Sequence, residues 1–214
     1  FGVETVLEKY NTLTTLGNMP PKYEVVKGAM SPIGLYCKLY NFSSRDNVLV
    51  FDDCDSILLD DLSLNILKAA LDSKKVRKIC WNTDSHMLRR EGVPDQFEFA
   101  GSVIFITNIK FDNVKSKKLR DHLEALESRC HYIDLTIDTL REKLLRIQQI
   151  VKDGMLNSYA LPEETKQQVV EYIWDHKRRL REVSLRTVLK IADLAKAFPE
   201  QWQDMATSTV LKPV

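Results

Sequence analysis

The stretch that most constrains the fold is Val48-Leu49-Val50-Phe51-Asp52-Asp53, in which four apolar residues run directly into two acidic ones. A short apolar run without polar alternation is typical of a strand buried on both faces of a sheet. The acidic residues come where such a strand would leave the sheet, and ligands of open α/β sheets bind at that edge. One carboxylate there can hold the hydration shell of Mg²⁺, and a second can orient water for attack on a phosphate. The same residues also fit a core strand followed by a helix N-cap, because Asp is common at helix starts.

Composition sets wide limits on the class of protein. The chain has 214 residues, 44% hydrophobic and 29% charged, which is enough for one domain or two small ones. A net charge of +1 gives no global field that would draw the chain to nucleic acid or to a membrane. There is no apolar run of about 18 residues and no signal-peptide pattern, so we expect a cytoplasmic protein that does not enter the membrane. Its four scattered cysteines are typical of reduced, mostly buried thiols: Cys37, Cys54, Cys80 and Cys130.

Strands and helices alternate in the first part of the chain. Helical spacing is found at residues 1–10, 32–40, 60–70 and 116–128, and strand-like runs at 23–27, 48–52, 103–108 and 131–135. Residues 12–21 read as a loop. Two further strand-like pieces near 78–81 and 97–99 flank a polar loop and predict a β-hairpin.

The second part of the chain is predicted to be all helical. Amphipathic helices are expected at 138–153, 162–181 and 184–197, and residues 203–214 read as a frayed tail. The predicted fold class is therefore α/β, with a parallel sheet between layers of helices in residues 1–136 and a smaller helical domain in residues 137–214.

Five motifs occur in an order that resembles the AAA+ ATPase family. Residues 48–53 look like its Walker B motif, and residues 102–108 (SVIFITN) look like its sensor 1 strand, with Asn108 at the tip. Residues 126–129 are similar to the arginine-finger segment, residues 141–150 (REKLLRIQQI) to the start of the lid, and residues 184–187 to sensor 2. The general character of the sequence is similar to AAA+ proteins carried by phages and plasmids. The resemblance implies an AAA+ core followed by a helical lid, with ATP and Mg²⁺ as cofactors.

The resemblance also implies roles for five residues. Asp52 would hold Mg²⁺ through its water shell, and Asp53 would take the place of the family's catalytic Glu, one methylene shorter. Asn108 would position the attacking water through its amide. Arg129 would act on a neighbouring subunit's nucleotide, and Arg186 would contact the nucleotide of its own subunit, as Asp52 and Asp53 do.

Structural alternatives remain for two of these residues, whereas the position of Arg186 argues the other way. Asn108 could cap a turn after a core strand, and Arg129 could be a helix-end cation favoured by the helix dipole, like Arg120. Arg186 sits near a predicted helix start, where the dipole disfavours a cation, so an anionic partner fits it better.

One motif of the family is missing. No Gly-x-x-x-x-Gly-Lys-[Ser/Thr] occurs, and the loop at 17–22 cannot form a phosphate cradle because its two prolines lack N–H groups. Without the strand that carries this P-loop, the sheet would have a gap beside the sensor 1 strand. We expect the chain to be part of a longer protein, cut just after the P-loop; the alternative is a relative that does not hydrolyse nucleotide.

Three functions are compatible with these patterns. The first is an ATPase that assembles into a homo-oligomeric ring, in this family most often a hexamer, and remodels a macromolecular partner. The second is a non-hydrolysing scaffold module on the same fold. The third is a DNA-acting motor or loader, with nucleic acid as partner. The predicted hairpin bears on the third, but its His86, Arg89 and Arg90 are offset by Asp84, Glu91 and Asp95. The loop at 28–31 lacks the aromatic residue that protein-threading relatives use, so the substrate is not readable from the sequence.

Overall fold

The computed structural model describes residues 2–14 and 22–213, and it divides into two compact units, Phe1–Ile133 and Asp134–Val214. The division falls three residues before the boundary that the sequence suggested between residues 136 and 137. Each unit has its own hydrophobic core, so each is described by itself.

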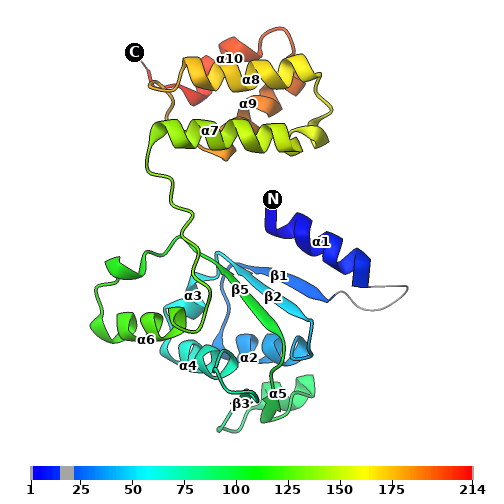
Figure 1. Ribbon diagram of the computed structural model, residues 1–214, viewed down its shortest axis with the longest axis vertical. Coiled ribbons are helices and arrows are strands. Elements are labelled where there is room, and N and C mark those ends of the chain that lie inside the picture. Colours follow the sequence, from blue (N-terminus) through cyan, green and yellow to red (C-terminus); the bar gives the residue numbers. More distant parts are fainter. Residues whose placement is uncertain (1, 15–21, 214) are drawn as a thin grey trace. The chain divides into compact units, whose positions relative to one another are not determined.

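The first unit is built on a three-stranded parallel sheet in the order β1-β2-β5 (Figure 1). Its strands are β1 (Tyr23–Lys27), β2 (Val48–Asp52) and β5 (Ser102–Ile106). Lys27 pairs with Asp52 in the register of β1 and β2, and Asp52 pairs with Ile106 in that of β2 and β5. All three strands therefore end at the same edge, and the predicted mixed α/β class with a parallel sheet is confirmed.

Helices flank this sheet. Figure 1 shows α2, α3 and α4 together on one side of it. Capping side chains fix where the helices begin: Ser31 accepts a hydrogen bond from the Gly34 amide, and Asp60 accepts one from the Ser63 amide at 2.7 Å. The helices of the unit are α1 (Gly2–Thr14), α2 (Pro32–Asn41), α3 (Asp55–Leu58), α4 (Asp61–Ala70), α5 (His86–Glu91) and α6 (Lys117–Glu127), with a 3₁₀ turn at Phe111–Asn113.

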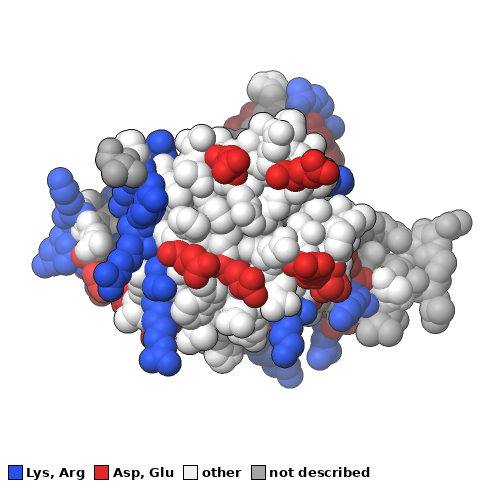
Figure 2. All heavy atoms as spheres, turned by 90° about the horizontal axis from the view of Figure 1, so that it is seen from above, with Lys and Arg blue, Asp and Glu red and all other residues white. Residues whose placement is uncertain are grey.

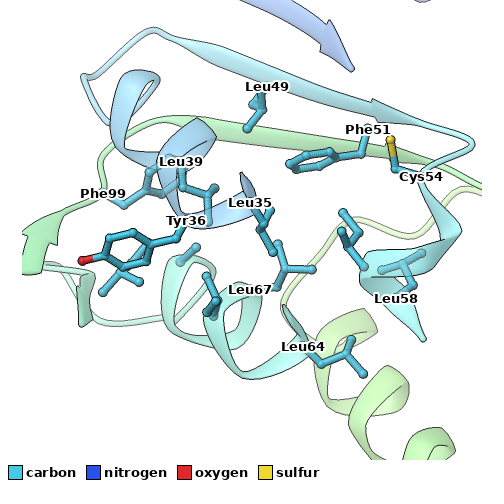
Figure 3. Packing of buried hydrophobic residues seen from close by; sticks show 14 of the residues in the cluster. Leu35, Tyr36, Leu39, Leu49, Phe51, Cys54, Leu58, Leu64, Leu67 and Phe99 are labelled. Carbon is cyan, nitrogen blue, oxygen red and sulfur yellow. The ribbon is translucent and has the colours of Figure 1, made fainter. Parts of the chain in front are cut away.

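The core of the first unit lies between β2 and the helices α2 and α4 (Figure 3). Leu49 and Phe51 of β2 point into this layer, toward apolar side chains of the two helices such as Leu35 and Leu67. Alternation along the strand places Val50 on the other face, where it is also fully buried. This burial on both faces explains the unalternated apolar run, and each such side chain stabilises the fold by about 1.5–3 kcal/mol.

The predicted hairpin is confirmed and contains a helix. Strands β3 (Lys78–Cys80) and β4 (Gln96–Glu98) pair antiparallel, and α5 lies between them in the sequence. The Arg77 guanidinium fastens the hairpin by donating to the carbonyls of Ala70 at 3.1 Å and Gly101 at 3.0 Å. At Gly101 an added Cβ would lie 2.3 Å from the carbonyl oxygen of Phe42, so the backbone approach there requires glycine.

The second unit is helical. Thr139 and Glu142 form a capping box at the start of its first helix, and Gly154, with φ of 101°, turns the chain after that helix. Its elements are α7 (Leu140–Ile150), a π turn (Val151–Met155), a 3₁₀ turn (Asn157–Tyr159), α8 (Glu163–Asp175), α9 (Leu185–Ala197) and α10 (Trp202–Val210).

Two predictions for this unit were wrong. The expected tail over 203–214, described here to residue 213, does not fray: Trp202, Ala206 and Val210 recur every four residues, are buried, and anchor α10 to the core. The helix expected over 162–181 ends at Asp175, because the chain turns at residues 176–179 and Leu180 forms an antiparallel bridge with Leu211.

Two expectations for the first unit also need correction. The helix at the start extends to Thr14, although a loop was expected from residue 12; residues 15–21, with most of the expected 17–22 loop, lie outside the described residues. The strand expected at 131–135 is absent: the segment has no regular structure, and Tyr132 and Ile133 are 63% and 74% exposed. Among the described residues, no strand pairs with this segment.

Candidate functional site

The candidate site lies where β2 and β5 end. Asp52 is the last residue of β2, and Asp53 follows with φ of 53°, in the left-handed region that Asp tolerates better than most side chains. The Asp53 amide still donates to the Ile106 carbonyl at 3.0 Å, so the turn starts while the ladder is intact. The chain therefore leaves the sheet abruptly, with the Asp53 side chain exposed at its edge.

The structure brings Asp53 and Asn108 together. The Asn108 amide donates from Nδ2 to Oδ1 of Asp53 at 3.1 Å, across 55 residues of sequence. Both side chains are exposed, so their outer polar atoms can reach a ligand. The turn-capping alternative for Asn108 does not account for this bond, because the amide joins the ends of two neighbouring strands.

A second bridge lies beside the first and was missed from the sequence. The Thr107 hydroxyl donates to Oδ1 of Asp55 at 2.6 Å and accepts from the Ile109 amide at 3.0 Å. Asp55 opens α3, so this contact ties the end of β5 to the start of that helix. The sequence did offer a signal for this role: Thr107 is a polar residue at a strand end, directly before Asn108.

Lys27 was also missed, and it is the cation of the site. Its Nζ lies 3.2 Å from Oδ2 of Asp52 and 3.2 Å from Oε1 of Glu4 in α1. The hydrogen bond to Asp52, followed by that to Glu4, raises the pKa of Lys27 above its ordinary value. The pairing follows from register, because Lys27 and Asp52 end neighbouring strands as direct partners.

Cys54 stabilises the turn after β2 by a hydrogen bond to β1. Its buried thiol donates to the Val26 carbonyl at 3.2 Å, which links the turn after β2 to β1. Burial raises the pKa of this thiol above its ordinary value, so it stays protonated and serves as a donor.

The two arginines expected at the site have different surroundings. Arg129 is exposed just after α6 and donates to the Ala125 carbonyl of that helix, as a helix-end cation does. Arg186 belongs to the second unit and is exposed in the first turn of α9, whose N-cap is Ser184. Its place near a helix start is the one that the sequence predicted.

The residues present fit a magnesium ion held through water. Asp52 already pairs with a cationic group, and Asp53 is open to solvent one residue further. Among the described residues no group of three or more His, Cys, Asp or Glu could enclose a metal. Mg²⁺ needs no such cage, since it keeps several waters and is commonly bound by one or two carboxylates and substrate phosphates.

The comparisons with known proteins give one similarity. The chain is 35% identical over 210 residues to a protein of Enterobacteria phage T4 described as an uncharacterized 36.7 kDa protein in the nrdC-mobD intergenic region. The match covers 97% of this chain and 63% of that protein. No family model matches the chain, and no solved structure matches it. None of the described helices is long and apolar enough to cross a bilayer.

Proposed function

We propose that the protein is a phage-type AAA+ ATPase that couples ATP binding and hydrolysis to the remodelling of a macromolecular partner. The observation that carries the proposal is the hydrogen bond between Asn108 and Asp53 at the ends of two adjacent parallel strands. A carboxylate and an amide on this edge are the pair needed to hold and polarise a water molecule.

Each residue of the edge has a task in this proposal. Bound ATP–Mg²⁺ supplies the phosphoanhydride to be hydrolysed and the charge that activates it. Asp52 would hold the water shell of the cation. Asp53 accepts a hydrogen bond from the attacking water, and Asn108 keeps the Asp53 carboxylate in one orientation.

The free edge of β5 supports a larger sheet. β2 is buried along its three central residues, whereas all residues of the equally apolar β5 are partly or fully exposed, with Ile106 at 37%. Exposed apolar residues at positions 132 and 133 form a second unpartnered run. A further strand along the edge of β5 would cover apolar surface there, and the T4 relative is longer than this chain.

The proposal is tested on the whole protein by phosphate release and nucleotide binding. Asp53→Asn keeps the shape but removes the base, so we expect retained ATP binding and a fall in turnover of about 10²–10⁴-fold. Asp112→Asn is the matched control, because Asp112 is an exposed carboxylate in the same unit, outside the site. A parent protein without ATP turnover, or an Asp53→Asn variant as active as the parent, would refute the proposal.

A further inference from the structure

A run of cations follows α8 in the second unit. Residues 177–181 read Lys-Arg-Arg-Leu-Arg, so four of five positions are basic. The bridge between Leu180 and Leu211 brings a fifth cation, Lys212, beside them: its amide donates to the Arg179 carbonyl at 2.8 Å. We call Lys177, Arg178, Arg179, Arg181 and Lys212 the basic end of the helical unit. In Figure 2, Lys and Arg side chains gather on the left, where Figure 1 shows the C-terminus.

Buried side chains and hydrogen bonds fix the backbone of the basic end. Leu180 and Leu211 are 4% and 2% exposed and anchor the two segments to the core. The Arg181 amide donates to the Val210 carbonyl at 3.0 Å, and its Nε donates to the Leu211 carbonyl at 2.9 Å. The backbone that carries the cations is therefore fixed, although the heads of Arg178, Arg179 and Lys212 lie in exposed residues.

No carboxylate of the described residues forms an ion pair with the basic end. Ion pairs occur elsewhere in the described part of the chain, for example between Lys166 and Glu163, but none within residues 2–14 and 22–213 involves these five cations. The helix dipole of α8 favours cations at its last turn, which ends at Asp175. The dipole therefore accounts only for the cations that directly follow Asp175. Arg181 and Lys212 lie beyond the helix, so the dipole leaves the cluster unexplained.

We propose that the basic end binds the phosphate backbone of nucleic acid. Clustered Lys and Arg without carboxylate partners are the electrostatic footprint of such binding, even in a chain whose net charge is only +1. Because the contacts are to phosphates, we expect little dependence on base sequence. This inference goes beyond the proposed ATPase activity and does not depend on it.

Two other anionic partners fit less well. A membrane surface would be met by apolar side chains beside the cations, but Leu180 and Leu211 are both buried. An acidic peptide would need apolar anchors in a hollow. A surface hollow of the helical unit, about 360 Å³ between α9 and α10, is lined by residues such as Leu194 and Phe198 and by none of the five cations.

The test is fluorescence anisotropy with labelled single-stranded and duplex DNA oligonucleotides, without nucleotide, on the full chain at several salt concentrations. We expect binding at 50 mM salt that weakens with salt by about 0.7 log units per log unit of salt for each contacted phosphate of a single strand. The triple variant Arg178→Ala, Arg179→Ala, Lys212→Ala should lose at least tenfold in affinity and about two units of that slope.

Control variants separate this surface from general charge. Arg146→Ala with Lys152→Ala removes exposed cations from α7 and the turn after it, and should change binding less than twofold. Circular dichroism and thermal melting check that every variant is folded. Failure of the parent to bind either DNA, an undiminished triple variant or an equal loss in the control would overturn the proposal. Polyglutamate is a further competitor. If it displaced the labelled DNA at the same concentration of charge as unlabelled DNA does, the surface would be assigned to acidic protein and the proposal would be overturned.

Discussion

At the scale of single residues, the sheet edge shows which contacts a sequence can predict. Asp52, Asp53 and Asn108 were placed together from the sequence because parallel strands end at one edge. Lys27 was not, because its contact with Asp52 depends on a register that only the structure gives. Thr107 was passed over because its bond goes to Asp55, at the start of the short helix α3, which was not predicted from the sequence.

Tyr36 gives a prediction about pH. It is fully buried, its hydroxyl donates to the Pro94 carbonyl at 2.9 Å, and burial raises its pKa to about 12. Between the unfolded value of 10.0 and about 12, the folded protein keeps a proton that the unfolded chain has released. The free energy of unfolding should therefore fall as pH rises above 10, and its Tyr36 part is fully present below that pH.

Urea unfolding of parent and Tyr36→Phe between pH 8 and 11 measures this effect. The variant should be less stable by about 1 kcal/mol at pH 8, because the Pro94 carbonyl loses its donor, and should lose less stability toward pH 11. Tyr132→Phe is the control, because Tyr132 is exposed. Parallel pH profiles for parent and Tyr36→Phe would contradict the assignment.

At the scale of elements, α10 is the clearest addition made by the structure. Trp202 is 4% exposed, and its ring lies 5.6 Å from that of Tyr172 in α8. Trp202→Ala should cost about 3–5 kcal/mol, because it removes the largest side chain that fastens α10 to the core. Chemical unfolding followed by far-ultraviolet circular dichroism measures the loss.

The neighbouring Gln203 supplies the control for this prediction. It is exposed one position further along α10, and Gln203→Ala should change stability by less than about 0.5 kcal/mol. A Trp202→Ala variant as stable as Gln203→Ala would mean that α10 contributes little to the unit.

Most elements could be predicted because local patterns decide them. Strands β2 and β5 carry apolar runs, β1 carries the Tyr and Val residues that favour strands, and α2 and α4 begin at side chains that cap them. The failures have a common cause, which is that distant contacts decided the outcome. Residues 131–135 have strand composition but no partner among the described residues, and Leu180 leaves the expected helix to pair with Leu211.

At the scale of the whole molecule, the proposed function requires assembly. Arg129 is exposed after α6 and held by the carbonyl of Ala125. An arginine that acts on a neighbour's nucleotide implies a heterologous interface, which gives a ring when the rotation between subunits closes. We predict a nucleotide-dependent ring, most often a hexamer in the family that the chain resembles.

Arg129→Ala in the whole protein should retain nucleotide binding and lose hydrolysis by about 10³-fold or more. Mixing it with Asp53→Asn subunits should restore part of the activity, because some interfaces then pair an intact arginine with an intact carboxylate. Lys117→Ala, an exposed cation at the start of α6, is the control. Analytical ultracentrifugation with and without nucleotide measures assembly; a strictly monomeric, fully active protein would disprove the finger role.

The close approach between Gly101 and the Phe42 backbone limits which mutations the gene can accept. Any mutation that replaces this glycine introduces a Cβ atom 2.3 Å from the Phe42 carbonyl oxygen. One of the two backbone segments must then move to relieve the clash. The position joins the hairpin to β5, so a shift there would displace the strand that carries Thr107 and Asn108 at its end. As the gene diverges, the codon for residue 101 is therefore held to a single amino acid by one backbone contact rather than by any chemistry of its own.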